Sequence, residues 1–336
     1  MRIPFLLVIV AFLAASSLAS DIPPASIDAL GGAELFRIDT AHSYLGFSIK
    51  FLGMTDVRGT FRDYDASILY DDNHPERTSV TLVIDTASID TNIEFRDKDL
   101  KTAKFFDVEK NPHIVFQSTS IEPKGNDHYV IHGNLTIKGI TRPIAIPMTR
   151  TIRRVADGAW GNIRIAGNGV IIIRRKDFGI LGNEFWGDKT LGDDVSITLE
   201  ILGIRPNYDE WSFDSEKKPS IGEVLQKTLE TEGAPAAAAR LRELKRDHSD
   251  DYNFAPEELG LLINRLMQRR KVTDALELLK AGDELYPQEP RFFARSGEAY
   301  ATIGDREQAI RMYEKAAALS PFGTESMEML RRLKAR

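Results

Sequence analysis

The chain has 336 residues, of which 42% are hydrophobic and 28% charged, a composition typical of a globular protein of about two domains. Its net charge of −6 argues against a nucleic-acid-binding protein, which usually carries a basic excess. Because the chain has no cysteine, its sequence excludes disulfides, thiolate metal sites, a cysteine nucleophile and lipidation through a lipoprotein-type cysteine.

Residues 1–20 have the pattern of a secretory signal peptide. Arg2 supplies a positive charge, an almost purely apolar run covers residues 3–15, and small residues follow, where Ser17-x-Ala19 suits cleavage before Ser20. The apolar run is short for a membrane span, and an uncleaved anchor or a buried N-terminal helix is the alternative. We therefore expect a periplasmic or secreted protein with no stable membrane span after cleavage.

A linker rich in Pro, Gly and Ala is predicted at residues 21–34, and a strand-rich domain over residues 35–204. Apolar and polar side chains alternate along this domain. Phe47, Ile49 and Phe51 are one example, with polar residues between them. This is the period of a strand that buries one face.

Turn signals such as Lys138-Gly139 divide the domain into about eight strands. Helix formers near residues 97–103 predict one helical interruption. An antiparallel sheet of this size removes its exposed edges by closing into a barrel, and a two-sheet sandwich is the alternative.

The composition changes after a polar linker at residues 205–220, because residues 221–336 have helical spacing of apolar side chains. Three pairs of matching residues are 34 positions apart: Ala275 with Ala309, Leu279 with Tyr313, and Pro287 with Pro321. That period predicts an all-α domain of TPR-like helical repeats, with a closing helix at residues 326–334. A peptide or protein is the expected partner of this domain.

The strand-rich domain also carries an ordered set of motifs. They are Phe36-Arg37-Ile38-Asp39 with His42-Ser43, Gly59-Thr60-Phe61, Asp90-Thr91 with Arg96-Asp97 and Phe105-Phe106-Asp107, residues 133–143, Arg175-Lys176-Asp177-Phe178-Gly179, and Gly192-Asp193-Asp194-Val195. In this order they resemble the YceI family over residues 36–204, about half of the chain. Phe51 and Leu52 stand where family members often carry a histidine before the Gly of the first hairpin.

The resemblance implies a lipocalin-like antiparallel barrel whose lumen holds a long apolar molecule, a polyisoprenoid or a related lipid. It implies no catalytic activity, no cofactor and no metal. The residues expected to line the lumen are Phe47, Ile49, Phe61, Leu82, Ile84, Phe116, Leu135, Ile137, Ile197 and Leu199. Without the resemblance, the residues alone favour a solid core made by these same side chains.

Three polar residues are candidates for contact with a ligand head group: Arg96, Asp97 and His113. A guanidinium at the mouth of a barrel suits a phosphate or carboxylate, but an arginine there also suits anchoring the short helix to the barrel. His113 begins a predicted strand, where it either contacts a ligand or faces water.

No other pattern identifies a site for chemistry. His128 and His132 share a strand face without a third metal ligand nearby, and neither a nucleophile elbow nor a phosphate-binding glycine loop is present. Two alternatives to a lipid-binding barrel stay open: a protein-interaction module with the barrel as scaffold, and an unrecognised hydrolase of a lipid or its phosphate.

Overall fold

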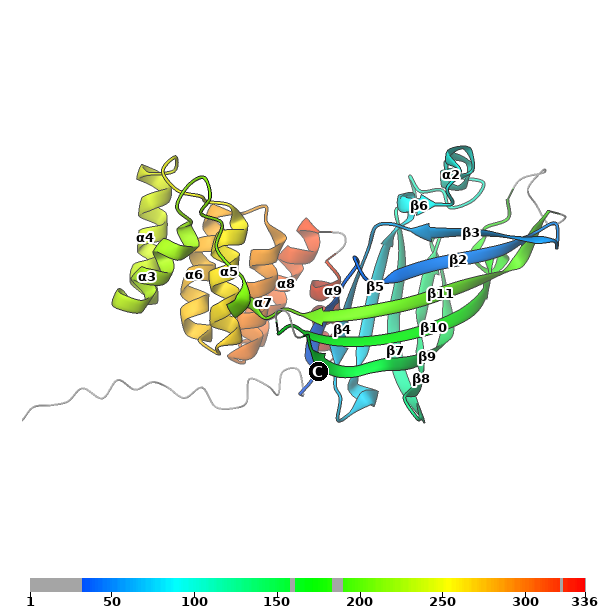
Figure 1. Ribbon diagram of the computed structural model, residues 1–336, viewed down its shortest axis with the longest axis horizontal. Coiled ribbons are helices and arrows are strands. Elements are labelled where there is room, and N and C mark those ends of the chain that lie inside the picture. The colour runs from blue at the N-terminus through cyan, green and yellow to red at the C-terminus, as the bar shows by residue number, and fades with distance from the viewer. Residues whose placement is uncertain (1–31, 158–160, 183–189, 321–322, 336) are drawn as a thin grey trace, which may run out of the picture.

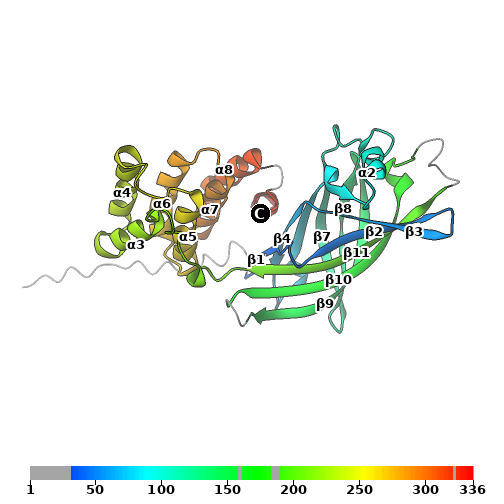
Figure 2. The same cartoon turned by 45° about the horizontal axis from the view of Figure 1, so that its top comes forward.

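A computed structural model describes residues 32–157, 161–182, 190–320 and 323–335. It has two parts, a β-barrel and a stack of helices, which lie end to end along the long axis of the molecule (Figures 1 and 2). The predicted signal peptide at residues 1–20 and most of the linker at 21–34 lie outside the described residues. Within the described ranges, every helix is too short or too polar to cross a membrane.

The barrel is built from antiparallel strands. They are β1 (Glu34–Ile38), β2 (Tyr44–Phe51), β3 (Thr55–Phe61), β4 (Tyr64–Tyr70), β5 (Ser79–Asp85), β6 (Ile89–Asp90), β7 (His113–Gly125), β8 (His128–Ile137), β9 (Ile140–Ala156), β10 (Ile163–Arg174) and β11 (Leu191–Arg205). The order β1-β4-β5-β7-β8-β9-β10-β11 is closed by pairing of β1 with β11, which makes a ring of eight strands. The prediction of an antiparallel barrel is therefore confirmed, and the two-sheet alternative is not adopted.

The remaining strands lie beside the ring. β2 pairs with the first part of β11, while β1 pairs with its end, so that β1 and β2 follow each other along the same edge. β3 pairs with β2 and carries the short β6. Helix α2 (Glu94–Lys101) follows β6 and is the helical interruption that the sequence predicted, beginning slightly earlier than expected.

Two hairpins of the barrel have turns that suit their sequences. Lys138 and Gly139 join β8 to β9 with φ values of 50° and 72°, and Asn126 and Asp127 join β7 to β8 with φ values of 50° and 61°. Two positive φ values in a two-residue loop match the right-handed twist of the strands, which is why Gly, Asn and Asp are favoured there. Within the described residues, the connections also contain the 3₁₀ segments η1 (Pro75–Arg77), η2 (Thr86–Ser88), η3 (Arg175–Phe178) and η4 (Tyr208–Glu210).

The C-terminal part is a stack of antiparallel helices. They are α3 (Ile221–Glu232), α4 (Ala234–Asp247), α5 (Pro256–Gln268), α6 (Val272–Leu285), α7 (Pro290–Thr302), α8 (Arg306–Leu319) and α9 (Thr324–Lys334). Both ends of α7 and α8 lie 34 residues after those of α5 and α6, as the residue spacing predicted. The preceding pair, α3 and α4, does not keep this phase.

Small residues allow these helices to pack closely around aromatic rings. A Cβ atom at Gly297 would lie 2.8 Å from the Tyr313 ring, and one at Gly282 would lie 2.8 Å from Phe292. Tyr313 and Phe292 are buried at these positions. The repeat therefore places small residues opposite aromatic rings across its helix pairs, which lets the helices pack closely.

The two parts are joined first by a docked connection between β11 and α3. The Tyr208 amide donates to Gln268 Oε1 over 3.0 Å, and Asp209 forms an ion pair with Arg269 at 2.7 Å. Arg265 donates to the Tyr208 carbonyl over 3.1 Å and stacks on the Phe213 ring at 4.7 Å from its centroid. The segment that the sequence predicted to be a linker is thus bound along α5.

The second junction is polar and buried. Helix α9 lies on the outer face of β4 and β5, where Glu328 accepts hydrogen bonds from Ser79 Oγ at 2.5 Å and Thr81 Oγ1 at 2.6 Å. Thr324 Oγ1 donates to Asp65 at 2.6 Å. Burial opposes ionisation of Glu325, but the guanidiniums of Arg37 and Arg295 hold the pKa of its carboxyl below the ordinary value. These contacts attach the helical stack to the barrel wall.

Candidate ligand-binding cavity

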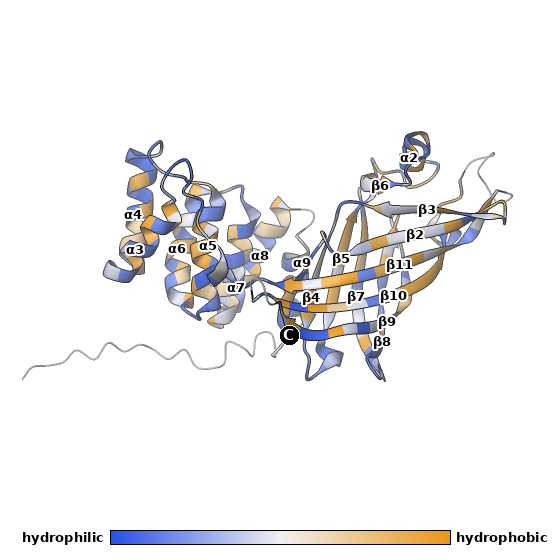
Figure 3. Cartoon of the chain, in the orientation of Figure 1, coloured by the Kyte–Doolittle hydropathy of each residue, from blue (hydrophilic) through white to orange (hydrophobic). Residues whose placement is uncertain are grey.

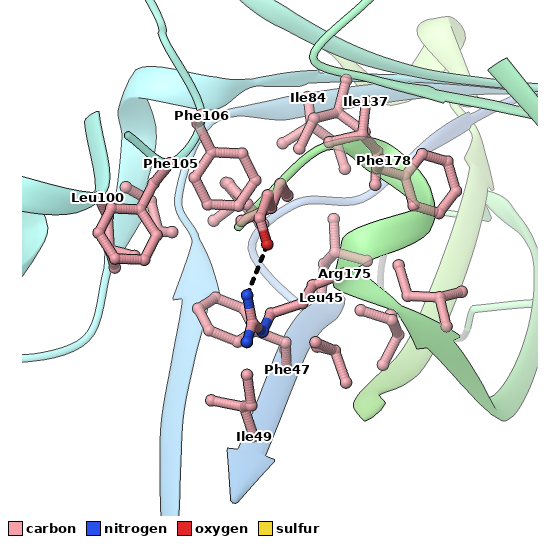
Figure 4. A pocket seen from close by; sticks show the side chains of 18 of the residues that line it. Leu45, Phe47, Ile49, Ile84, Leu100, Phe105, Phe106, Ile137, Arg175 and Phe178 are labelled. Atoms are coloured by element: carbon pink, nitrogen blue, oxygen red, sulfur yellow. Dashed lines mark hydrogen bonds between the residues drawn. The ribbon is translucent and has the colours of Figure 1, made fainter. Parts of the chain in front are cut away.

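The barrel encloses a cavity of about 420 Å³. All ten residues predicted to line the lumen are in its wall. The wall is almost entirely aliphatic and aromatic, and Figure 4 shows phenylalanines from several segments around one space. The interior is therefore hollow, and the alternative of a solid core is wrong.

Strand alternation explains why these residues point inward. Leu82 pairs with Phe116 across β5 and β7, and Phe116 pairs with Leu135 across β7 and β8. Figure 3 shows the same alternation as orange and blue bands along β9, β10 and β11. Because successive side chains of a strand point to opposite faces, one face of each strand supplies the wall.

Glycines seat two of the aromatic rings. Phe47 is paired with Gly59 on β3, and a Cβ atom at Gly59 would lie 2.5 Å from the Phe47 ring. A Cβ atom at Gly133 would likewise lie 2.5 Å from the ring of Phe116. Each ring therefore lies over the backbone of a neighbouring strand, and a side chain at the glycine would push it into the cavity.

Sequence reasoning missed several wall residues. They are Leu45, Ile89, Leu100, Phe105, Phe106, Ile114, Ile144, Ile146, Ile171, Ile173, Phe178 and Ile180, among others. Phe105, Phe106 and Phe178 belong to the family-like motifs, which was the available signal. Ile171 and Ile173 lie in a continuous apolar run with Val170 and Ile172, which are exposed, so alternation of hydropathy could not separate the two faces.

Arg175 is a buried cation in the cavity wall. Its guanidinium donates to the carbonyls of Ile180 at 2.7 Å, Gly192 at 2.8 Å and Leu181 at 2.9 Å. Figure 4 shows Arg175 among the apolar side chains of the wall. Hydrogen bonds to several carbonyls compensate a buried guanidinium for the water it has lost. Arg175 thus ties the segment after η3 to the start of β11 and shapes this end of the cavity.

The polar candidates at α2 bind the protein itself. Arg96 lies in the cavity wall and donates to Thr91 Oγ1 at 2.7 Å and to the Thr91 carbonyl at 2.8 Å. Asp97 accepts from the Thr91 amide at 2.9 Å and from its hydroxyl at 2.5 Å. Both side chains therefore anchor α2 to the residue after β6, and contact with a ligand head group stays a prediction.

His113 is placed differently. It is the first residue of β7 and pairs with Asp85 of β5, whereas the next residue, Ile114, lines the cavity. Since neighbouring residues of a strand point to opposite faces, the His113 side chain is directed away from the cavity.

His128 and His132, the two histidines that share a face of β8, contact different side chains. His128 contacts Thr149 Oγ1 at 3.0 Å, and His132 lies 3.4 Å from Glu122. In the part of the chain that the structure describes, no group of three or more His, Asp or Glu side chains is arranged to bind a metal ion.

Comparison with known proteins places these features in context. A family model described as a YceI-like domain matches residues 36–202. A UPF0312 protein of Azotobacter vinelandii is 35% identical over 169 residues, covering 49% of this chain and 82% of the relative. A UPF0312 protein of Serratia proteamaculans is 35% identical over 175 residues, covering 51% of this chain and 86% of the relative.

Solved structures also resemble the barrel. The crystal structure of Burkholderia cenocepacia BcnA is 25% identical and covers 49% of this chain and 98% of its own, with a TM-score of 0.44. A polyisoprenoid binding domain from Saccharophagus degradans is 14% identical and covers 51% of this chain and 98% of its own, with a TM-score of 0.40. These alignments cover about half of the present chain.

Proposed function

The chain belongs to the YceI-like domain family, and we propose that its barrel binds a long apolar chain, a polyisoprenoid or a similar lipid, for transport, storage or sequestration. The observation that carries this proposal is the hollow interior, about 420 Å³ lined by apolar side chains. A cavity of this kind excludes water from a hydrocarbon without offering directional contacts, so it selects for length and apolar character.

The energetics suit a long chain. Each buried CH₂ group contributes about 0.8 kcal/mol. Roughly ten to fifteen carbons then contribute about 8–12 kcal/mol, which is comparable with the ~4–15 kcal/mol that association costs in lost freedom. Short hydrocarbons are therefore expected to bind weakly. A binding role needs none of the paired catalytic groups that a hydrolase requires.

Native extraction tests this function. Protein purified without detergent is extracted with organic solvent, and the extract is compared by mass spectrometry with that of a Leu135→Trp variant, in which an indole projects into the cavity. A long-chain lipid in the wild-type extract, depleted in the variant, is the expected result. Extracts without lipid in both, together with no uptake of added polyprenol, would contradict the proposal.

The place of action is proposed to lie outside the cytoplasm, in the periplasm or in the medium. The signal-like N-terminus supports this assignment. Cell fractionation followed by N-terminal sequencing tests it, with a mature N-terminus near Ser20 as the expected result. An intact Met1 on protein in the cytoplasmic fraction would refute it.

The helical stack is a candidate module for docking a peptide or protein. The specific observation is that α5 already holds a connecting segment of the chain, through the contacts that Arg265, Gln268 and Arg269 make with residues 208–213. A partner segment of similar character, aromatic and acidic, would use the same donors. It would compete with a tethered segment whose effective concentration is of the order of millimolar.

Peptide titration tests this second role. A synthetic peptide with the sequence of residues 207–214 is expected to bind a Tyr208→Ala/Asp209→Ala chain more tightly than the wild type, because the variant's own segment competes less. Adding Arg265→Ala to that variant should abolish the binding. Equal peptide affinity in all three proteins would contradict a docking site at α5.

A further inference from the structure

The first turn of α2 displays two large apolar side chains to solvent. Ile93, the N-cap residue, is 50% exposed and Phe95 is 77% exposed, although neither lies in a mobile terminus or a long loop. The helix buries none of its residues. Exposed apolar groups gathered at one place on a soluble protein usually mark a surface that binds something.

This exposed turn is continuous with the cavity. Phe95 belongs to the cavity wall while most of its surface faces outward. Further along the same segment, Leu100, Phe105 and Phe106 lie at the cavity, as Figure 4 shows. The segment from Ile93 to Phe106 therefore leads from the outside of the molecule to the cavity, where Arg96 and Asp99 lie in the wall beside its apolar side chains.

The attachment of this segment is local and polar. Arg96 and Asp97 both bind Thr91, and the turn between β6 and α2 has Asn92 at a φ of 62°. Helix α2 makes its principal contacts with the two-residue strand β6. A helix held in this way can shift as a unit, since few packed side chains resist its movement.

The charges of the segment suit a lipid surface. Residues 93–104 contain four basic and three acidic side chains, in a chain whose net charge is −6. Lys98 is exposed and paired with Glu94 at 2.7 Å, and Lys104 is also exposed. With a net charge of +1, this segment is attracted to an anionic membrane, in contrast to the chain as a whole.

We propose that the first turn of α2 is a membrane-docking site, through which Ile93 and Phe95 insert into the surface of a lipid bilayer and bring the mouth of the cavity to it. The proposal rests on the lipid-binding function proposed above, because a water-insoluble ligand must be collected from, or released to, a lipid phase. Interfacial binding of this kind combines burial of apolar side chains with attraction of basic residues to lipid phosphates.

Sedimentation with vesicles tests the site in the full chain. Vesicles of phosphatidylethanolamine and phosphatidylglycerol are mixed with wild type, Ile93→Asp and the matched control Ile303→Asp. Ile303 is also an isoleucine at a helix end and is 40% exposed, but it lies at α7 in the helical stack. Ile93 is outside the cavity wall, so Ile93→Asp leaves the cavity unchanged.

The expected result is a fall of about tenfold or more in the vesicle partition coefficient for Ile93→Asp, since an isoleucine that inserts into the bilayer is replaced by a charge, with no comparable change for Ile303→Asp. Equal binding of the three proteins, or no binding by the wild type, would overturn the proposal. Solvent extraction of the same samples reports lipid content separately. Loss of vesicle binding with lipid content retained therefore assigns the defect to docking rather than to the cavity.

Discussion

Replacement of Glu328 by alanine should detach α9 from the barrel. The Glu328 carboxylate is 1% exposed and accepts hydrogen bonds from Ser79 and Thr81, and it pairs with Arg331 at 2.8 Å. Arg331 in turn donates to the Ser118 carbonyl. The alanine leaves a buried threonine hydroxyl without its acceptor and a half-buried arginine without its counter-ion.

The structure sets the size of this effect. Breaking a buried charge network by removing one partner costs roughly 3–5 kcal/mol, whereas removal of an exposed pair costs about 0–1 kcal/mol. Glu314 of α8 provides the matched control, because it pairs with Lys334 at the end of α9 at 2.8 Å with both side chains about half exposed. Glu314→Ala is therefore expected to behave nearly as wild type.

Hydrogen exchange read by mass spectrometry is the assay. In Glu328→Ala, peptides covering residues 324–334 should lose protection, as should peptides from β4 and β5, on which α9 packs. Peptides from β8 to β10 should keep theirs. Protection of residues 324–334 equal to that in Glu314→Ala would refute the view that this polar contact holds the two parts together.

Three further outcomes are expected. Burial raises the pKa of Asp283 from 3.8 to about 6 despite its hydrogen bond from Ser296. The protonated Asp283 carboxyl favours folding, and this contribution is fully present below pH 3.8 and is lost as the pH rises through 6, where the buried carboxylate forms. Asp283→Asn should therefore stabilise the helical stack at pH 7 but not at pH 3.5, in chemical unfolding at both values. Thr91→Ala, which removes the hydroxyl that binds Arg96 and Asp97, should cost about 1–2 kcal/mol of local stability and speed hydrogen exchange in α2 alone; unchanged exchange would contradict the anchoring role. Leu135→Trp should displace bound lipid while its outward control Ile172→Trp retains it, judged by extraction and by unchanged circular dichroism.

Much of the architecture was predictable because the two periods in the sequence, two residues in the barrel and 34 residues in the helical stack, follow from the geometry of strands and of helix pairs. Alternation over residues 35–204 indicated strands with one apolar face, and the 34-residue spacing anticipated the helix ends of α5 to α8. The lumen residues were also predictable, since each lies on the apolar face of its strand. Whether that face encloses a cavity depends on strand number and ring closure, which are tertiary properties that periodicity does not contain.

The junction between the two parts was not predictable from pattern. Thr81 and Ser67 are buried, yet on a strand they resemble the polar residues of a solvent-facing surface. Glu328 likewise has the character of a residue on the exposed face of a helix. Their burial follows from mutual hydrogen bonding across the interface, which depends on a contact between segments about 250 residues apart.

The head-group candidates show the same limit. Arg96 and Asp97 were correctly expected beside the short helix, but one residue, Thr91, takes the hydrogen bonds of both. A sequence names potential donors and acceptors without showing which of them are already satisfied by the protein.

The central claim is that the hollow barrel carries a long apolar molecule. The most direct test is mass spectrometry of the full chain under native conditions, followed by extraction and identification of whatever is released. The account predicts a stoichiometric complex with a long-chain lipid that is lost in Leu135→Trp and retained in Ile172→Trp. A wild-type protein that has only the mass of its polypeptide, and that stays so after incubation with polyprenol, would contradict it.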